Sequence, residues 1–121
     1  MRPEEMRVYQ VAREFAREVD RILAVLPPRL ARIANHLERS TESVGFNLNE
    51  GLTAFKPRVK ASAFDISRRE AGEARKAMQR AVDRKGIQQT GVAKADQLAN
   101  ALIGMLTVMI KQQEKRDEDG E

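Results

Sequence analysis

The chain has 121 residues, of which 41% are hydrophobic, 33% are charged and 4% are aromatic, and it has no cysteine and a net charge of +4. This length supports one domain with a modest core, and the absence of cysteine excludes disulfides and thiolate metal sites. No apolar run approaches the roughly 18 residues that span a bilayer, and the N-terminus has no apolar signal core. We therefore expect a soluble protein without a membrane partner, in a cytoplasmic setting.

Three breaks divide the chain into four segments of similar length. Pro27-Pro28 ends the first segment, because a proline pair removes two hydrogen-bond donors. Pro57 suits the first turn of a new helix, and Gly86 and Gly91 bracket the third break. The predicted helices span about 4–25, 29–55, 58–84 and 91–114, in a domain of residues 1–113 followed by a frayed acidic tail over 114–121. Matched helices with short connections predict an all-α, antiparallel up-down four-helix bundle.

Each predicted helix carries an apolar stripe when its residues are placed at 100° intervals. The stripes of the first two helices are Val8, Val11, Ala12, Phe15, Val19, Ile22 and Leu23, and then Leu30, Ile33, Ala34, Leu37, Thr41, Val44, Leu48, Leu52 and Phe55. The third stripe is thinner and rich in alanine: Val59, Ala63, Ile66, Ala74, Ala77, Met78 and Ala81. So many alanines predict a close approach of the neighbouring helices.

The fourth helix is apolar over more of its circumference than one core can use. Its core stripe is Leu98, Leu102, Met105, Leu106, Met109 and Ile110. Ala101 and Val108 extend this stripe, and a helix of this kind usually buries two sides. Phe46 lies on the outer face of the second helix, where the alternative is a lone exposed phenylalanine. We predict self-association through Phe46, Ala101, Met105 and Val108.

Residues 37–51 of the second helix carry polar side chains that an amphipathic helix does not need. Ser43, Asn47 and Glu50 follow one another at steps of four and three, so they share one face, and Gly51 comes next. One interpretation is a ligand site that faces a groove or a ring pore. The other, which we favour, is a structural polar network in which Arg39 or an arginine of the third helix compensates Glu50, because an unpaired buried carboxylate costs several kcal/mol.

Catalytic and metal chemistry find little support in the sequence. His36 is the only histidine, and one imidazole does not make the usual metal site. It precedes Ser43 by two helical turns, roughly 10 Å, which is too far for direct proton transfer. The isolated glycines lack the strand-to-helix setting of a phosphate loop. We expect no catalytic residue, metal or cofactor, and no enzyme activity.

The third helix carries the strongest functional signal. Residues 56–85 contain ten basic and four acidic residues. Six of the basic residues spread over the side away from the alanine stripe: Arg58, Arg68, Arg69, Arg75, Lys76 and Arg80. Arginine forks match phosphate geometry, so this face predicts sequence-independent nucleic-acid binding. The alternative is a solvated face partly paired to neighbouring carboxylates, and the lack of interleaved aromatic residues argues against a dedicated single-strand reader.

Residues 37–51, from Leu37 through Ser43 and Asn47 to Gly51, resemble a sequence pattern of the bacterial family of 23S rRNA intervening-sequence proteins. The family pattern is Leu-x-Arg followed by Ser-Ile-x-x-Asn-Ile-x-Glu-Gly. It is matched at Leu37, Arg39, Ser43, Asn47, Glu50 and Gly51, with Val44 and Leu48 as conservative replacements. Gly45 stands where the family usually has proline, and the glycine-serine pair of the third helix has no clear counterpart. The resemblance implies pentameric rings, and a related bundle is the accessory subunit of diversity-generating retroelements, where it binds a reverse transcriptase and nucleic acid.

We therefore predict a non-catalytic homo-oligomer, a pentamer by resemblance, that binds RNA or DNA backbone as an adaptor or scaffold. The resemblance adds a partner protein as a further expected ligand. The alternative is a purely structural or protein-interaction oligomer that has no nucleic-acid role and whose charge serves only solubility.

Overall fold

Four long helices account for most of the chain. The computed structural model describes residues 3–120. In it, α1 spans Pro3–Val25, a 3-10 turn spans Pro28–Leu30, α2 spans Ala31–Thr53, α3 spans Pro57–Asp83 and α4 spans Gln89–Glu118. No strand occurs among the described residues. The all-α architecture predicted from the sequence is confirmed.

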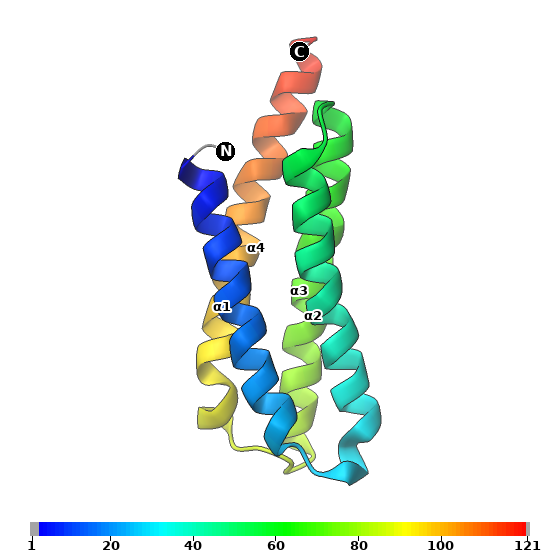
Figure 1. The fold of residues 1–121 in the computed structure, drawn as a ribbon, viewed down its shortest axis with the longest axis vertical. Coiled ribbons are helices and arrows are strands. Elements are labelled where there is room, and N and C mark those ends of the chain that lie inside the picture. Colours follow the sequence, from blue (N-terminus) through cyan, green and yellow to red (C-terminus); the bar gives the residue numbers. More distant parts are fainter. Residues whose placement is uncertain (1–2, 121) are drawn as a thin grey trace.

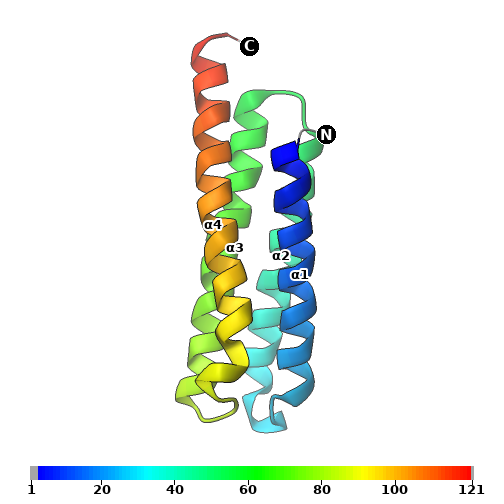
Figure 2. The ribbon, with the colours of Figure 1, turned by 90° about the vertical axis from the view of Figure 1, so that its left-hand side faces the viewer.

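The helices form an antiparallel up-down bundle in which neighbours in the chain are neighbours in space (Figure 1). The α2–α3 and α3–α4 contacts are the most extensive, and α1 closes the bundle against α2 and α4. The view turned by 90° shows all four helices running along one long axis (Figure 2). Short connections between helices of similar length favour this arrangement.

The helix ends follow from local backbone chemistry. The proline pair forms a 3-10 turn before α2, and Pro57 opens α3, where its missing N–H costs nothing. At the end of α3, Lys85 takes the left-handed conformation with φ 59°, and Gly86 N–H donates to the carbonyl oxygen of Ala81 at 2.9 Å. This is a Schellman motif, which reverses the chain. Gly86 is needed there for space, because a Cβ would overlap Leu30.

The core is built from large aliphatic side chains, two phenylalanines and a run of alanines. The largest fully buried side chains include Phe15, Phe64, Leu30, Leu37, Leu48, Met78, Leu102 and Leu106. On α3 the buried residues are mostly small, with Ala71, Ala74, Ala77 and Ala81 all inside. These small side chains allow α2 and α4 to pack close to α3, as the sequence predicted.

Three residues that periodicity placed in the core lie at the surface instead. Phe55 is 92% exposed, because α2 ends at Thr53 and Phe55 falls in the loop beyond it. Val59 and Ile66 are exposed at 50% and 37%. The buried stripe of α3 runs through Phe64 and its neighbours, a rotation that turns Val59 and Ile66 outwards.

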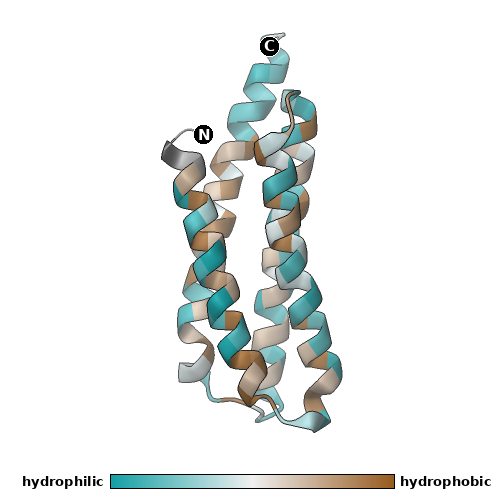
Figure 3. Cartoon of the chain, viewed as in Figure 1, coloured by the Kyte–Doolittle hydropathy of each residue, from teal (hydrophilic) through white to brown (hydrophobic). Residues whose placement is uncertain are grey.

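The last helix extends further than the sequence suggested. A frayed acidic tail was predicted for 114–121, but residues 114–118 remain helical, and residue 121 lies outside the described residues. Gln113 is buried and accepts a hydrogen bond of 2.8 Å from Arg116 Nη1. Lys115 and Arg116 also complement the helix dipole in the last turn. The end of α4 therefore projects beyond the other helices as a hydrophilic extension (Figures 1 and 3).

Candidate nucleic-acid interface

The polar residues of α2 divide into a bonded pair and two exposed charges. Asn47 Nδ2 donates to the carbonyl oxygen of Ser43 at 2.9 Å and to its Oγ at 3.0 Å. Arg39 and Glu50 are exposed, and neither makes an ion pair within the described part of the chain. The expected network therefore exists only between Ser43 and Asn47. Glu50 needs no compensating arginine, because water solvates its carboxylate.

Gly51 has a packing role that the sequence could not identify. A Cβ at Gly51 would lie 2.5 Å from Cδ1 of Phe64, whose ring is buried between α2 and α3. Nearby, Lys60 Nζ donates to the carbonyl oxygens of Gly51 and Leu52 at 2.8 and 3.2 Å. Ser67 Oγ donates to the carbonyl oxygen of Val44 at 2.8 Å. The end of the motif at Gly51 is thus the place where α3 is attached to α2.

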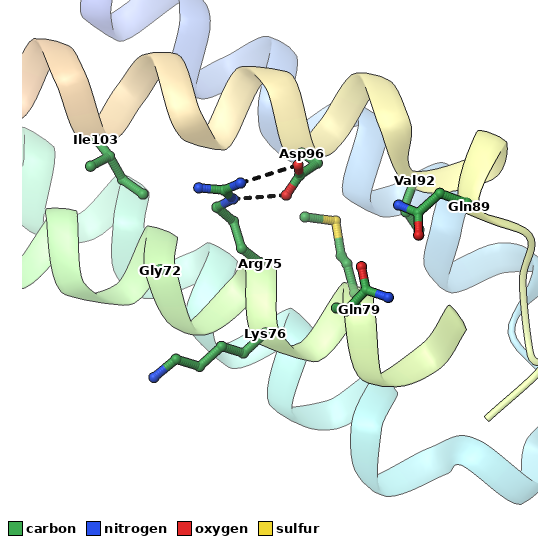
Figure 4. Close-up of a pocket in the computed structure, with 9 residues that line it drawn as sticks. Gly72, Arg75, Lys76, Gln79, Gln89, Val92, Asp96 and Ile103 are labelled. Atoms are coloured by element: carbon green, nitrogen blue, oxygen red, sulfur yellow. Dashed lines mark hydrogen bonds and ion pairs between the residues drawn. The ribbon is translucent and has the colours of Figure 1, made fainter. Parts of the chain in front are cut away.

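Arg75, on the side of α3 that faces α4, is paired with a carboxylate of α4. Arg75 binds Asp96 through two hydrogen bonds, Nε to Oδ1 at 2.8 Å and Nη2 to Oδ2 at 3.3 Å (Figure 4). Its Nη1 also donates to Asn100 Oδ1 at 3.3 Å. The hydrogen bond to Asp96 raises the pKa of Arg75, partial burial opposes this, and the negative charge of Asp96 adds to it. The pair lines a groove of about 440 Å³ between α3 and α4, from which Lys76 points away (Figure 4).

Two further predicted arginines share one carboxylate. Arg68 Nη2 donates to Asp65 Oδ1 at 2.6 Å, and its Nη1 donates to Thr107 Oγ1 of α4 at 3.2 Å. Arg69 Nε lies 3.3 Å from Asp65 Oδ2. Arg68 and Arg69 therefore have less positive charge to offer an external phosphate than their number suggests, in line with the alternative of a partly paired face.

The remaining predicted residues separate to opposite ends of the α2–α3 seam. Arg58 lies in a groove of about 580 Å³ with Phe46, Glu50 and Ile66. Lys76 and Arg80 lie at the other end, in a groove of about 350 Å³. We call this second site the basic groove; it is lined by Arg32, Ile33, His36, Lys76, Ala77 and Arg80. The six predicted residues thus lie in different surroundings: Arg68, Arg69 and Arg75 contact carboxylates, Arg58 lines one groove, and Lys76 and Arg80 line another.

Arg32 was not predicted as a site residue, and His36 was predicted to have no metal or catalytic role. A signal was present, since Arg32 precedes His36 by four residues and Lys76 precedes Arg80 by four, so each pair shares one helix face. What the spacing could not show is that antiparallel packing brings the two pairs to one groove. His36 Nε2 lies 3.9 Å from Glu73 Oε2 across the seam.

The same end of the bundle carries further cations. Arg29 Nη2 donates to the carbonyl oxygen of Lys85 at 3.3 Å, which joins the α1–α2 and α3–α4 loops. Arg84 is exposed beside Lys85, while Asp83 accepts a hydrogen bond from Gln79 at 3.0 Å. Positive charge therefore gathers at this end from two loops and two helices.

The predicted oligomer residues are accessible in the single chain. Phe46 is 67% exposed, Ala101 and Val108 are exposed, and Met105 is half-buried. Among the residues whose side chains are described, no three His, Cys, Asp or Glu residues gather to hold a metal ion. None of the described helices is long and apolar enough to cross a membrane.

Together the fold and its surface define a small four-helix-bundle protein with a basic groove between its second and third helices. The family model for 23S rRNA-intervening sequence proteins matches residues 4–108, and the chain belongs to that family. It is similar to a solved structure from Bacteroides thetaiotaomicron, described as a protein of unknown function from the S23 ribosomal protein family. The two are 18% identical, with a TM-score of 0.82, over 89% of this chain and 98% of the other. Among curated proteins, none matches the chain.

Proposed function

We propose that the protein is a non-catalytic homo-oligomer that binds the phosphate backbone of RNA or DNA at its basic end and acts in the cytoplasm as an adaptor or scaffold. The supporting observation is that Arg32 and Arg80, from two different helices, line one groove, and neither makes an ion pair among the described residues. Arginine stays charged and matches phosphate geometry, so such a pair is suited to a phosphate oxygen.

The charge balance around the groove supports an anionic ligand. Lys76 Nζ lies 3.9 Å from Glu73 Oε1, at the limit of an ion pair, and Glu73 also faces His36 at 3.9 Å. The Lys76 contact is longer than the pairs of Arg68, Arg69 and Arg75, which lie at 2.6 to 3.3 Å, so Lys76 is held less closely by its carboxylate, and an exposed pair of this kind contributes about 0–1 kcal/mol. Glu38 and Glu42 lie along the outer face of α2 in a neighbouring depression that Arg32 and His36 also line. The positive field is therefore local to the groove and its adjoining loops.

Self-association would multiply this charge. The exposed Phe46 lies beside Val59 and Ile66 at the far end of the α2–α3 seam, and α4 presents Ala101 and Val108. These two surfaces differ, so their contact would be head-to-tail, and such contacts generate rings when the rotation closes. A ring, with five copies favoured by the resemblance, would repeat the basic groove around one assembly and strengthen its field. A partner protein is a further proposed ligand, and it too rests on the resemblance to the family.

The deciding experiment is the solution mass by light scattering, with and without a mixed RNA and DNA oligonucleotide, over a series of salt concentrations. We expect an oligomer that gains mass with oligonucleotide, and an affinity that falls on a log–log plot with a slope of about −0.7 to −0.9 per phosphate contacted. Arg32→Glu/Arg80→Glu should abolish binding. Arg58→Glu/Arg69→Glu changes the net charge equally and should retain most of it.

A second candidate function is a structural or protein-interaction oligomer with no nucleic-acid role. It is favoured by the internal pairing of Arg68, Arg69 and Arg75 with carboxylates. This candidate predicts weak association that neither double variant changes. A monomer that ignores oligonucleotides would overturn both candidates.

A further inference from the structure

Three cations of the α2–α3 seam, Arg32, Lys76 and Arg80, lie together in the basic groove. A nucleic-acid strand that lies along a protein needs a track of cations spaced along its backbone. Here the potential track is interrupted: Arg68, Arg69 and Arg75 bind carboxylates, and Arg58 lies in a different groove beside Glu50. What remains along α3 is Lys76 with Arg80, one turn apart, facing Arg32 on α2.

The basic groove is also small and has an apolar base. Its volume of about 350 Å³ is at the low end of sites that enclose a small ligand. Half-buried Ile33 contributes most of the apolar surface, and Ala77, which is 5% exposed, forms the floor beside it. Three cations, Arg32, Lys76 and Arg80, surround this surface together with His36, and Glu73 lies 3.9 Å from both Lys76 and His36. A cationic rim around an apolar base suits a ligand that is anionic at one end and has a flat, weakly polar body.

We propose that the basic groove binds a terminal phosphate monoester of a nucleotide, with the phosphate held by Arg32 and Arg80 and the sugar or base resting on Ile33 and Ala77. This inference rests on the proposed function, because it refines which phosphate the same site selects. A terminal monoester carries a charge of about −1.5 to −2 at pH 7, whereas each backbone diester carries one negative charge. Cations that converge from two helices gain most from the more highly charged group.

The rigidity of the site supports selection of one group. Arg32 and His36 lie within α2, and Lys76 and Arg80 lie within α3, so the backbones that carry them are parts of long helices. Their loops are joined by the hydrogen bond from Arg29 to the carbonyl of Lys85. Side chains on a fixed framework lose less entropy when they close on a ligand than side chains on mobile loops. His36 lines the same groove and would also lie near the phosphate. Across the seam, its Nε2 lies 3.9 Å from Glu73 Oε2.

The test compares two oligonucleotides of one sequence, labelled with a fluorophore at the 3′ end and carrying either a 5′-phosphate or a 5′-hydroxyl. Fluorescence anisotropy at moderate salt measures their affinities for the wild-type protein, with a nucleoside 5′-monophosphate as competitor. We expect the 5′-phosphorylated strand to bind about tenfold more tightly, as one added charge-assisted contact implies. Arg32→Gln/Arg80→Gln should remove this preference, and Arg58→Gln/Arg69→Gln should keep it. Circular dichroism is the control that checks whether both variants are folded.

The outcomes separate this inference from the function on which it rests. Equal binding of both strands, lost in Arg32→Gln/Arg80→Gln, overturns the terminal-phosphate site and leaves backbone binding intact. Absence of binding to either strand overturns both proposals. A preference for the 5′-phosphate that survives in Arg32→Gln/Arg80→Gln also overturns the groove as its site. Competition by the mononucleotide at the concentration at which the strand binds supports the site and identifies a free nucleotide as its ligand, whereas weak competition identifies the strand end.

Discussion

The two ends of the α2–α3 seam are built from the same two helices yet use their charged residues in opposite ways. At one end, Lys60 is buried and donates to backbone carbonyls of Gly51 and Leu52. At the other end, Arg32 and Arg80 are exposed and make no ion pair among the described residues. The first end is therefore a structural attachment between helices, and the second has charge available for a ligand. Residue type alone does not distinguish these roles, because both ends are basic.

The largest expected effect comes from Gly51→Val at the attached end. The added side chain would enter the space of the buried Phe64 ring, and overpacking of a core costs about 1–3 kcal/mol or more. Helix propensity alone would favour almost any replacement of glycine, by about 0.5–1 kcal/mol. We expect packing to win, because the overlap with a buried ring puts its cost at the top of this range, with a net loss of about 2.5 kcal/mol in the free energy of urea unfolding followed by circular dichroism. A stabilised Gly51→Val protein would show that the close approach to Phe64 is wrong, and Gly45→Val, which has open space around it, is the matched control.

A smaller loss is expected for Lys60→Met, which shortens the unbranched side chain by one atom and removes its charge. Two carbonyl oxygens at the end of α2 would lose a charged donor, and hydrogen bonds to charged groups contribute about 1.5–3 kcal/mol. Methionine recovers part of this through apolar burial, so we expect a loss of about 2 kcal/mol in unfolding free energy. Lys56→Met removes an equal charge from an exposed position next to α3 and should change stability by less than about 0.5 kcal/mol. Equal effects of the two changes would contradict a special role for Lys60.

The smallest effect on stability is expected at the basic end. Arg32→Gln/Arg80→Gln changes exposed side chains that make no ion pair in the described residues, so the unfolding free energy should stay within about 0.5 kcal/mol of the wild type. The same variant should lose oligonucleotide binding. A clear drop in stability would place these arginines with Lys60 as structural residues, and the contrast between the two ends would disappear.

The fold could be predicted because its signals are local. Prolines at 27–28 and 57 mark breaks within a residue or two of their positions, and the apolar stripes are legible at a spacing of 3.6 residues. Errors arose where the helix end or its rotation depends on packing. Phe55 fits the stripe of α2 but falls after the end of that helix, and Ile66 is exposed because α3 is rotated so that Phe64 faces the core. Burial in a tightly packed interior is decided by volume as well as by periodicity.

The candidate site was only partly predictable, because the availability of a charge depends on residues distant in the sequence. Arg75 belongs to the predicted basic face, but its partner Asp96 lies 21 residues away on another helix. Arg68 reaches Thr107 across 39 residues. By contrast, Arg32 was not predicted as a site residue, and only the packing of α2 against α3 places it beside Arg80.

The helices, their breaks, the bundle and the excess of positive charge were predictable, since these follow from local spacing and composition. The family motif of α2 was also legible as a pattern. Only the packed bundle reveals that Gly51 makes room for Phe64, that three of the predicted arginines are paired, and that Arg32 and Arg80 meet in one groove. The physical reason is that screening and close packing act between atoms in contact, and those contacts join helices that the chain keeps far apart.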